Sequence, residues 1–193
     1  MNPTPLIIGI GGTTREGSTS ERMLVKALEA AERAGARTQL FGGLFLARLP
    51  IYDPATAASC AELNQLLDGV RQADGVLIAT PGYHGSISGL IKNALDSLEG
   101  LRDDPRPYFE GRAVGCLVTA DGWQAGGTTL SAMRTIVHAL RGWVTPLGVA
   151  FNPSVAPLFD DAGALAQARD QAQIDMVAGQ VVEFARMRMA AGR

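Results

Sequence analysis

Residues 75–96 read Gly75-Val-Leu-Ile-Ala-Thr-Pro-Gly-Tyr-His-Gly-Ser-Ile-Ser-Gly-Leu-Ile-Lys-Asn-Ala-Leu-Asp96. The apolar run that ends at Thr80 is typical of a parallel strand buried on both faces. After a loop of glycines and hydroxyl residues, apolar residues recur from Leu90 to Leu98 at helical spacing. The loop therefore joins the carboxyl end of a strand to the amino end of a helix, which is where open α/β sheets bind their ligands.

The same order of strand, loop and helix recurs along the chain. Strands are predicted at residues 6–10, 38–41, 75–80, 113–119 and 144–151, each followed by a helical pattern, the last from about 164 to 189. Ser18-x-x-Glu21 and Ser59-x-x-Glu62 are capping-box signals for the first two helices. Strands that alternate with helices require right-handed crossovers, so we predict an α/β protein with a five-stranded parallel sheet in the doubly wound order 2-1-3-4-5.

Length and composition narrow the class of protein. A chain of 193 residues is long enough for one α/β domain, so residues 1–193 are predicted to form a single domain. The formal charge is −2, no dense Lys/Arg cluster is present, and no run reaches the roughly 18 apolar residues of a membrane helix. We therefore expect neither a nucleic-acid partner nor a membrane.

The cysteines and the amino terminus favour a cytoplasmic location. Cys60 and Cys116 lie far apart in the sequence and lack metal-ligand spacing, which suits a reducing compartment. Both are expected to be inert core thiols. The N-terminus shows no signal-peptide pattern.

The predicted strand order brings the loops after the first, third and fourth strands to one edge of the sheet. The first of them, residues 11–20, places several hydroxyls and Arg15 at a helix amino terminus, where unpaired N–H groups and the helix dipole favour an anion. Arg15 can supply a charge-assisted hydrogen bond, and Thr13, Ser18 and Ser20 neutral ones. A phosphate fits this loop, although a capped helix with a hydrophilic loop is the simpler alternative. The loop is neither a Walker A motif nor a dinucleotide Gly-x-Gly-x-x-Gly.

The other two loops suit a flat polar ring. Gly82 and Gly85 let backbone N–H groups approach a heterocycle closely, with Tyr83 and His84 along its face. His84 is a weak candidate for a general base, because no neighbouring carboxylate is evident to orient it. Residues 121–127 would form the far wall, where Trp123 is either part of the site or an interface or lid aromatic.

Two further polar features are assigned outside catalysis. Lys92 and Asp96 are spaced as a surface ion pair on a helix. His138 is interpreted as a partly buried helix residue or an interface residue.

At this point the residues resemble a known family. Gly12-Thr-Thr-Arg-Glu-Gly-Ser18 resembles the Gly-Ser/Thr-x-Arg-x-x-Ser phosphate motif of the NAD(P)H-dependent FMN reductases, and residues 81–96 resemble their flavin-ring loop. These include alkanesulfonate-system flavin reductases and chromate and quinone reductases. The resemblance spans about residues 5–151. Thr13 replaces the commoner Ser of the first motif and keeps the hydroxyl.

The resemblance implies a flavodoxin-like fold, a three-layer α/β/α sandwich that holds FMN and uses NADPH or NADH as the hydride donor. The flavin carries the redox step, so no catalytic side chain and no metal site are expected. The residues expected to bind the cofactor are Thr13, Arg15, Ser18, Thr19, Ser20, Pro81, Gly82, Tyr83, His84, Gly85, Ser86, Asp121, Gly122 and Gly126.

The resemblance also implies partners and leaves alternatives open. It implies small-molecule substrates (a nicotinamide and a flavin or quinone-like acceptor), a flavin-dependent monooxygenase that receives reduced FMN, and a homodimer or homotetramer. An alternative of the same fold retains its FMN and reduces quinones, azo compounds or metal oxyanions. A non-enzymatic flavodoxin-type electron carrier is less favoured, because such carriers are strongly acidic and this chain is near neutral.

Overall fold

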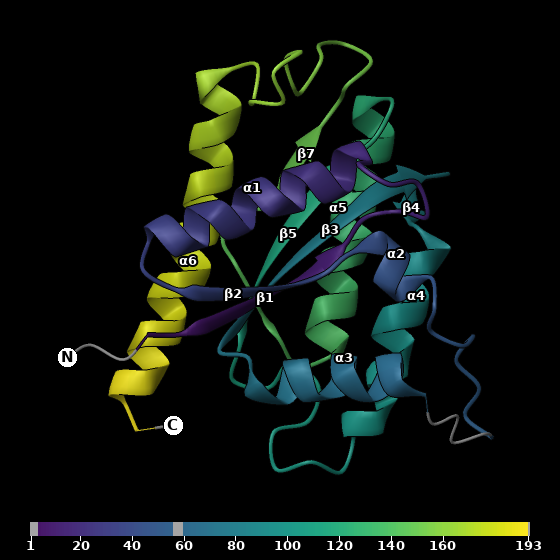
Figure 1. The fold of residues 1–193 in the computed structure, drawn as a ribbon, viewed down its shortest axis with the longest axis vertical. Coiled ribbons are helices and arrows are strands. Elements are labelled where there is room, and N and C mark those ends of the chain that lie inside the picture. Colours follow the sequence, from purple (N-terminus) through teal and green to yellow (C-terminus); the bar gives the residue numbers. More distant parts are fainter. Residues whose placement is uncertain (1–3, 56–59, 193) are drawn as a thin grey trace.

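The computed structural model describes residues 4–55 and 60–192, and all of its named strands join one sheet (Figure 1). The strand order is β2-β1-β3-β5-β6, and β7 also pairs with β5 in parallel. With β6 and β7 counted as one position, this is the predicted order 2-1-3-4-5. The parallel strands are β1 Leu6–Gly11, β2 Arg37–Phe41, β3 Gly75–Tyr83, β5 Ala113–Thr119, β6 Trp143–Val144 and β7 Val149–Phe151.

Helices cover both faces of the sheet, which confirms the predicted flavodoxin-like three-layer sandwich (Figure 1). One face packs against α1 (Thr19–Arg33) and α6 (Ala168–Ala190). The other packs against α3 (Ala61–Gln72), α4 (Gly89–Asp96) and α5 (Trp123–Ala139). None of the helices in the described residues combines the length and apolarity that a membrane span requires.

The sheet separates two hydrophobic cores because successive strand side chains point to opposite faces. Ile7 and Leu77 enter the core under α1 and α6, whereas Ile8 and Ile78 enter the core under α3, α4 and α5. Every residue of β5 is buried, as the continuous apolar run predicts. The strands are therefore held rigidly, and their carboxyl ends present the loops that follow them at one edge.

Three predicted elements differ from the structure in extent by more than one residue. The strand predicted at residues 75–80 continues as β3 to Tyr83. The fifth strand, predicted at residues 144–151, is interrupted between β6 and β7, where Pro146 has no N–H to donate and the Thr145 hydroxyl donates to Leu147 O over 2.7 Å. The last helix begins at Ala168 rather than near Ala164, because the preceding residues form a turn closed by the bridge Phe159–Leu165.

Three short elements were not predicted from the sequence. Strand β4 (Ser86–Ile87) pairs antiparallel with the end of β3. Helix α2 (Gly43–Leu46) follows β2, and the 3-10 helix η1 (Ser97–Leu101) extends α4. The first two of these matter for the site described below.

The helix caps are confirmed only in part. Ser18 caps α1, since its Oγ accepts a hydrogen bond from Glu21 N at 3.4 Å. Glu21 does not return the bond but accepts one from Gly43 N of α2 at 2.6 Å. Ser59 lies outside the described residues, and the N-cap of α3 is Cys60.

The two cysteines differ in burial. Cys60 is half-buried, and its Sγ accepts a hydrogen bond from Leu63 N, so its assignment as a core thiol was wrong. Cys116 is a buried core thiol, and desolvation raises its pKa to about 12. A thiol with so high a pKa is inert near neutral pH.

Candidate functional site

Loops at the carboxyl ends of β1, β3 and β5 line one open pocket of about 530 Å³, which we call the main pocket. Its volume falls within the roughly 300–1,000 Å³ typical of small-molecule sites. The predicted site residues that line it are Thr13, Arg15, Ser18, Thr19, Ser20, Pro81, Gly82, Tyr83, His84 and Asp121. The predicted convergence of the three loops is thus observed.

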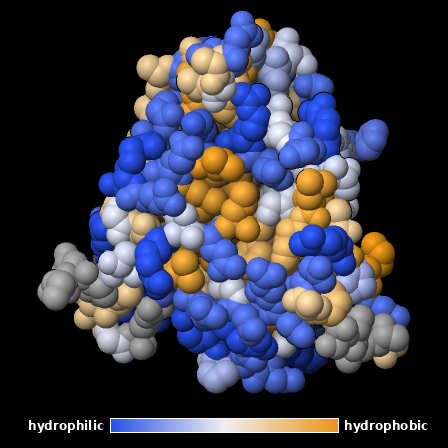
Figure 2. Space-filling view, viewed as in Figure 1, coloured by the Kyte–Doolittle hydropathy of each residue, from blue (hydrophilic) through white to orange (hydrophobic). Residues whose placement is uncertain are grey.

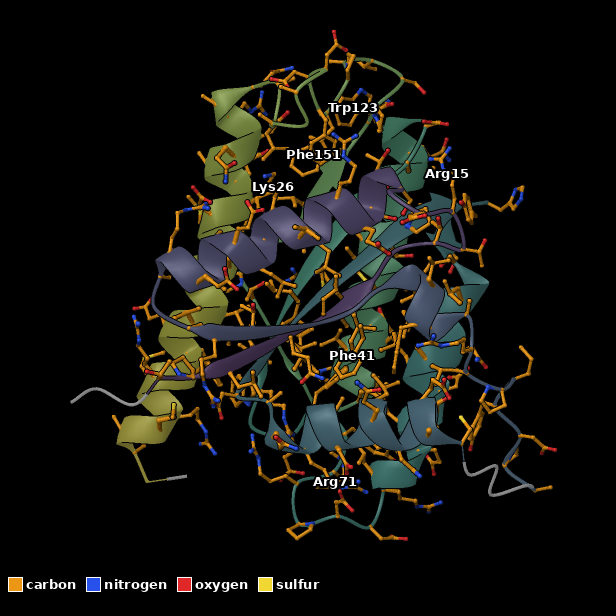
Figure 3. All side chains as sticks on the ribbon, viewed as in Figure 1. Arg15, Lys26, Phe41, Arg71, Trp123 and Phe151 are labelled. Carbon is orange, nitrogen blue, oxygen red and sulfur yellow. The ribbon has the colours of Figure 1, made fainter. Side chains whose placement is uncertain are left out.

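The first loop ends at the amino terminus of α1, where the first backbone N–H groups have no acceptor within the helix. Ser18 and Ser20 are buried beside it, with their hydroxyls 3.4 Å apart. Thr13 Oγ1 accepts from Arg15 N at 3.1 Å and tightens the turn. Arg15 itself is exposed, beside this end of α1 (Figure 3). Donors of several kinds therefore converge where a phosphate was predicted.

A support that sequence reasoning missed lies behind this loop. Gly12 has φ of +109°, a conformation that glycine adopts without strain. A Cβ on Gly43 would collide with the backbone of Thr13, so the loop rests directly on α2. The carboxylate of Glu21 fixes the same end of α2 through Gly43 N. Nothing in the local pattern signals this contact, because it joins residues far apart in sequence.

The second loop is a tight β-hairpin rather than an open loop. Gly82 pairs with Ile87 and Tyr83 with Ser86, which leaves His84 and Gly85 as the two-residue turn. Their φ angles, 53° and 82°, are both positive, as a type I′ turn requires.

Buried hydroxyls hold the hairpin to the rest of the sheet. Thr80 Oγ1 accepts from Ser88 N at 3.1 Å, and Thr129 Oγ1 of α5 donates to Ser86 O at 3.3 Å. His84 is exposed at the tip, and no carboxylate of the described residues hydrogen-bonds its imidazole. The hairpin is therefore a fixed platform with an exposed imidazole at its end.

The third loop forms the far wall through Asp121. The hydroxyl of Ser154, which follows β7, donates to Asp121 Oδ1 at 2.8 Å. This bond ties together the segments that follow β5 and β7, and the neighbouring Pro153 lines the main pocket. Trp123 is 65% exposed at the start of α5 and does not line the pocket (Figure 3).

A second hollow of about 590 Å³ adjoins the main pocket, and we call it the side hollow. It shares His84, Asp121 and Ala125 with the main pocket, so the two are continuous. The predicted residues Gly85 and Gly122 lie here, whereas Ser86 and Gly126 line neither. The remaining lining residues of the side hollow are Gln124 and Thr128.

Three lining residues of the main pocket lie outside the loops predicted to form the site: Thr119, Ala120 and Pro153. Thr14 and Ala125 belong to the predicted loops of residues 11–20 and 121–127 but were not among the residues expected to bind the cofactor. Thr119 and Ala120 lie at the end of β5, where the strand-end rule alone would have found them. Pro153 belongs to a segment with no motif, so no local signal marks it.

Two features assigned outside the site do lie outside it. Lys92 Nζ is 2.7 Å from Asp96 Oδ1 on the exposed side of α4, which confirms the surface ion pair. His138 is exposed on α5, not partly buried, and lines neither hollow. Among the described residues, no group of three or more His, Cys, Asp or Glu side chains could hold a metal ion.

Known proteins share both the sequence pattern and the fold. A family model described as NADPH-dependent FMN reductase matches residues 5–155. An FMN-dependent NADPH-azoreductase of Staphylococcus aureus is 32% identical over 134 residues, which is 67% of this chain and 68% of the relative.

Two solved structures are similar in fold. FerB, a flavoenzyme NAD(P)H:(acceptor) oxidoreductase from Paracoccus denitrificans, superposes with a TM-score of 0.77 at 18% identity, covering 96% of this chain and 99% of that one. An NADH:FMN oxidoreductase (EMOB) in its apo form gives 0.68 at 24% identity, covering 91% and 89%. At these identities the similarity concerns the fold alone.

Proposed function

The chain belongs to the NADPH-dependent FMN reductase family and is an NAD(P)H-dependent flavin oxidoreductase, and we propose that its main pocket is the site that binds FMN. The observation that carries this proposal is the meeting of the hydroxyl-rich loop, the β3–β4 hairpin and Asp121 around one pocket. The first supplies donors for a phosphate, and the other two supply walls for a flat ring.

The donor chemistry of the pocket fits FMN from end to end. At the phosphate end, Arg15 contributes the positive charge, and the hydroxyls of Thr13, Ser18 and Ser20 surround the amino end of α1. Pro81 to Ser86 provide the platform for the isoalloxazine, where the backbone of Gly82 carries no side chain. Thr19 and Asp121 of the main pocket and Gly122 of the adjoining side hollow supply the remaining proposed contacts, whereas Gly126 is buried, lines neither hollow and is left out of the proposal.

The residues of the pocket would bind FMN, orient it and shield it from solvent, because the cofactor carries the redox chemistry. When bound, FMN supplies a centre that accepts a hydride from a nicotinamide and passes two electrons to an acceptor. The type I′ turn fixes the hairpin against which the ring would lie, and Thr129 of α5 holds it in place. His84 is assigned to ring contact rather than to proton transfer.

We propose two candidate fates for the electrons. In the first, the protein treats FMN as a substrate and releases it to a flavin-dependent monooxygenase. In the second, it retains FMN and reduces quinones or azo compounds. The similarity to a protein named FMN-dependent NADPH-azoreductase favours the second.

We also propose that the protein is a cytoplasmic homodimer or homotetramer. Large apolar side chains exposed at Leu44, Ile51 and Trp143 support an oligomer. Both cysteines are free thiols, which supports a reducing compartment. Sedimentation velocity at micromolar concentration tests the proposed oligomer, and a monomer at all concentrations would refute it.

Anaerobic stopped-flow absorbance tests the proposed function. Oxidation of NADH and of NADPH is followed with and without added FMN, and then with a quinone. We expect nicotinamide oxidation that depends on FMN. Ternary-complex kinetics with free FMN support the first fate, and ping-pong turnover of a quinone by protein with stoichiometric FMN supports the second. Failure to oxidise either nicotinamide with any flavin or quinone would contradict the proposal.

A further inference from the structure

The side hollow and the phosphate end of the main pocket have opposite electrostatic character. The phosphate end carries Arg15 and the amino terminus of α1, both of which favour an anion. The side hollow has no lysine or arginine among its described lining residues. The titratable side chains among these described lining residues are those of Asp121 and His84.

The amino end of α5 also reaches the side hollow and acts in the opposite sense to Asp121. Gly122 is the N-cap of α5 and has no side chain to cap the helix. The helix dipole places roughly half a positive charge at such an end, whereas the Asp121 carboxylate is a full negative charge next to the cap. The carboxylate outweighs the dipole, so the side hollow is negative while Asp121 is ionised.

Asp121 is held at the junction of the two hollows. It lines both of them, and the Ser154 hydroxyl donates to its Oδ1 at 2.8 Å from the segment after β7. Both side chains are exposed to solvent. The side hollow also touches the hairpin tip at His84 and Gly85, so a molecule bound there lies between the hairpin and this carboxylate.

We propose that the side hollow is the entry site for electron acceptors and that Asp121 makes it selective for uncharged ones, namely quinones and neutral azo compounds, over anions such as chromate or sulfonated dyes. This inference rests on the proposed function in its acceptor-reducing form. In the overall reaction NAD(P)H gives up a hydride, which carries both electrons. The quinone takes up that hydride equivalent and one proton from water to become a hydroquinone, and NAD(P)⁺ is released.

The test compares a neutral and an anionic quinone, 2-methyl-1,4-naphthoquinone and 1,4-naphthoquinone-2-sulfonate, at pH 8 and low salt. The quantity measured is the ratio of kcat/KM for the anion to that for the neutral quinone, in the FMN-loaded wild-type protein and in Asp121→Asn. Intrinsic reactivities cancel when the two ratios are compared. Removal of the carboxylate leaves the dipole uncompensated, so we expect the ratio to rise about three- to tenfold.

A second variant and a matched control sharpen the result. Gln124→Lys adds a cation to the wall of the side hollow and should raise the ratio in the same direction. Asp161→Asn changes the net charge by the same amount at an exposed residue that lines neither hollow, and it should leave the ratio unchanged. Added salt should raise the wild-type ratio by screening the repulsion.

Calorimetric titration of the FMN-loaded protein with the sulfonate, without nicotinamide, gives a readout independent of turnover. Tighter binding of the sulfonate by Asp121→Asn than by wild type supports the inference. Equal ratios and equal affinities in wild type, Asp121→Asn and Gln124→Lys would overturn it, as would an equal change in Asp161→Asn. If neither quinone is reduced, the acceptor-reducing form of the proposed function fails, and the calorimetry still decides the charge selection.

Discussion

Arg15 is the only lysine or arginine among the described residues that line the main pocket. It lies beside the amino end of α1 (Figure 3), where its charge adds to that of the helix dipole. A phosphate bound there gains a charge-assisted hydrogen bond, whereas riboflavin, which lacks the phosphate, gains none. This difference allows the assignment of the phosphate end to be tested at a single residue.

Arg15→Ala should weaken FMN binding by about 1.5–3 kcal/mol, the usual loss of a charge-assisted contact. Quenching of flavin fluorescence measures the affinity, and the salt dependence of FMN binding should become shallower. Arg102→Ala removes an equal charge from an exposed ion pair with Glu99 outside the pocket and should leave the affinity unchanged. An equal loss of riboflavin affinity in Arg15→Ala would show that Arg15 does not contact the phosphate.

Individual residues of the site were predictable where a strand-end rule or a local motif marked them. Ser18, Thr13 and Arg15 follow the first strand directly, so the topology places them at the pocket. Pro153 and the contact between Glu21 and Gly43 were not predictable, because they depend on how distant segments pack. Side-chain roles that arise from tertiary contacts leave no local pattern.

Two elements that were not predicted shape the site: the hairpin formed by β3 and β4, and helix α2. His84-Gly85 occupies a type I′ turn, in which the first position favours Asn, Asp or Gly. Histidine tolerates positive φ better than most residues, so the sequence carried a weak hairpin signal. The α2 helix is too short for a periodic pattern, and its position under the first loop follows from packing.

The support of the first loop by α2 can be tested at Gly43. Gly43→Ala forces a Cβ against the Thr13 backbone, so the loop must shift. We expect a loss of about 1–3 kcal/mol in the free energy of unfolding and weaker FMN binding. Urea denaturation and flavin fluorescence measure the two effects.

Gly179→Ala is the matched control for Gly43→Ala. It introduces the same methyl group into α6 where nothing lies within 4 Å. This change should raise the free energy of unfolding by about 0.5–1 kcal/mol, because alanine favours a helix over glycine. FMN affinity unchanged by Gly43→Ala would mean that α2 does not position the loop.

At the scale of the whole molecule, the two edges of the sheet have different roles. The main pocket lies at the carboxyl ends of the strands. At the amino ends, the fully buried Arg112 guanidinium donates to the carbonyls of Arg71, Ala73, Tyr108 and Glu110. A buried charge is tolerated when it is hydrogen-bonded in this way, so this edge stabilises the fold while the other stays open to ligands.

The hydropathy of the surface also differs from one region to another. In the view of Figure 2, apolar residues gather in a central patch framed by hydrophilic ones. Leu40 of the edge strand β2 and Leu44 of α2 are among the exposed large apolar residues of the chain. These side chains are in keeping with the proposed assembly of several copies.

The architecture as a whole was predictable because strand runs and helical periods repeat in strict alternation. Buried strands such as β3 and β5 leave a continuous apolar signal, and the crossover rule then fixes the order. The fifth strand was predicted to run unbroken from 144 to 151, although Pro146 and Gly148 are residues that interrupt strands, and the structure divides it there into β6 and β7.

A crystal structure of the protein with FMN bound tests the proposed cofactor site most directly. We predict that the phosphate lies against Thr13 to Ser20 at the amino end of α1, with the isoalloxazine against the hairpin of residues 81–86 and beside Asp121. FMN bound anywhere else on the protein, or bound in the main pocket with its phosphate at the hairpin, would contradict it.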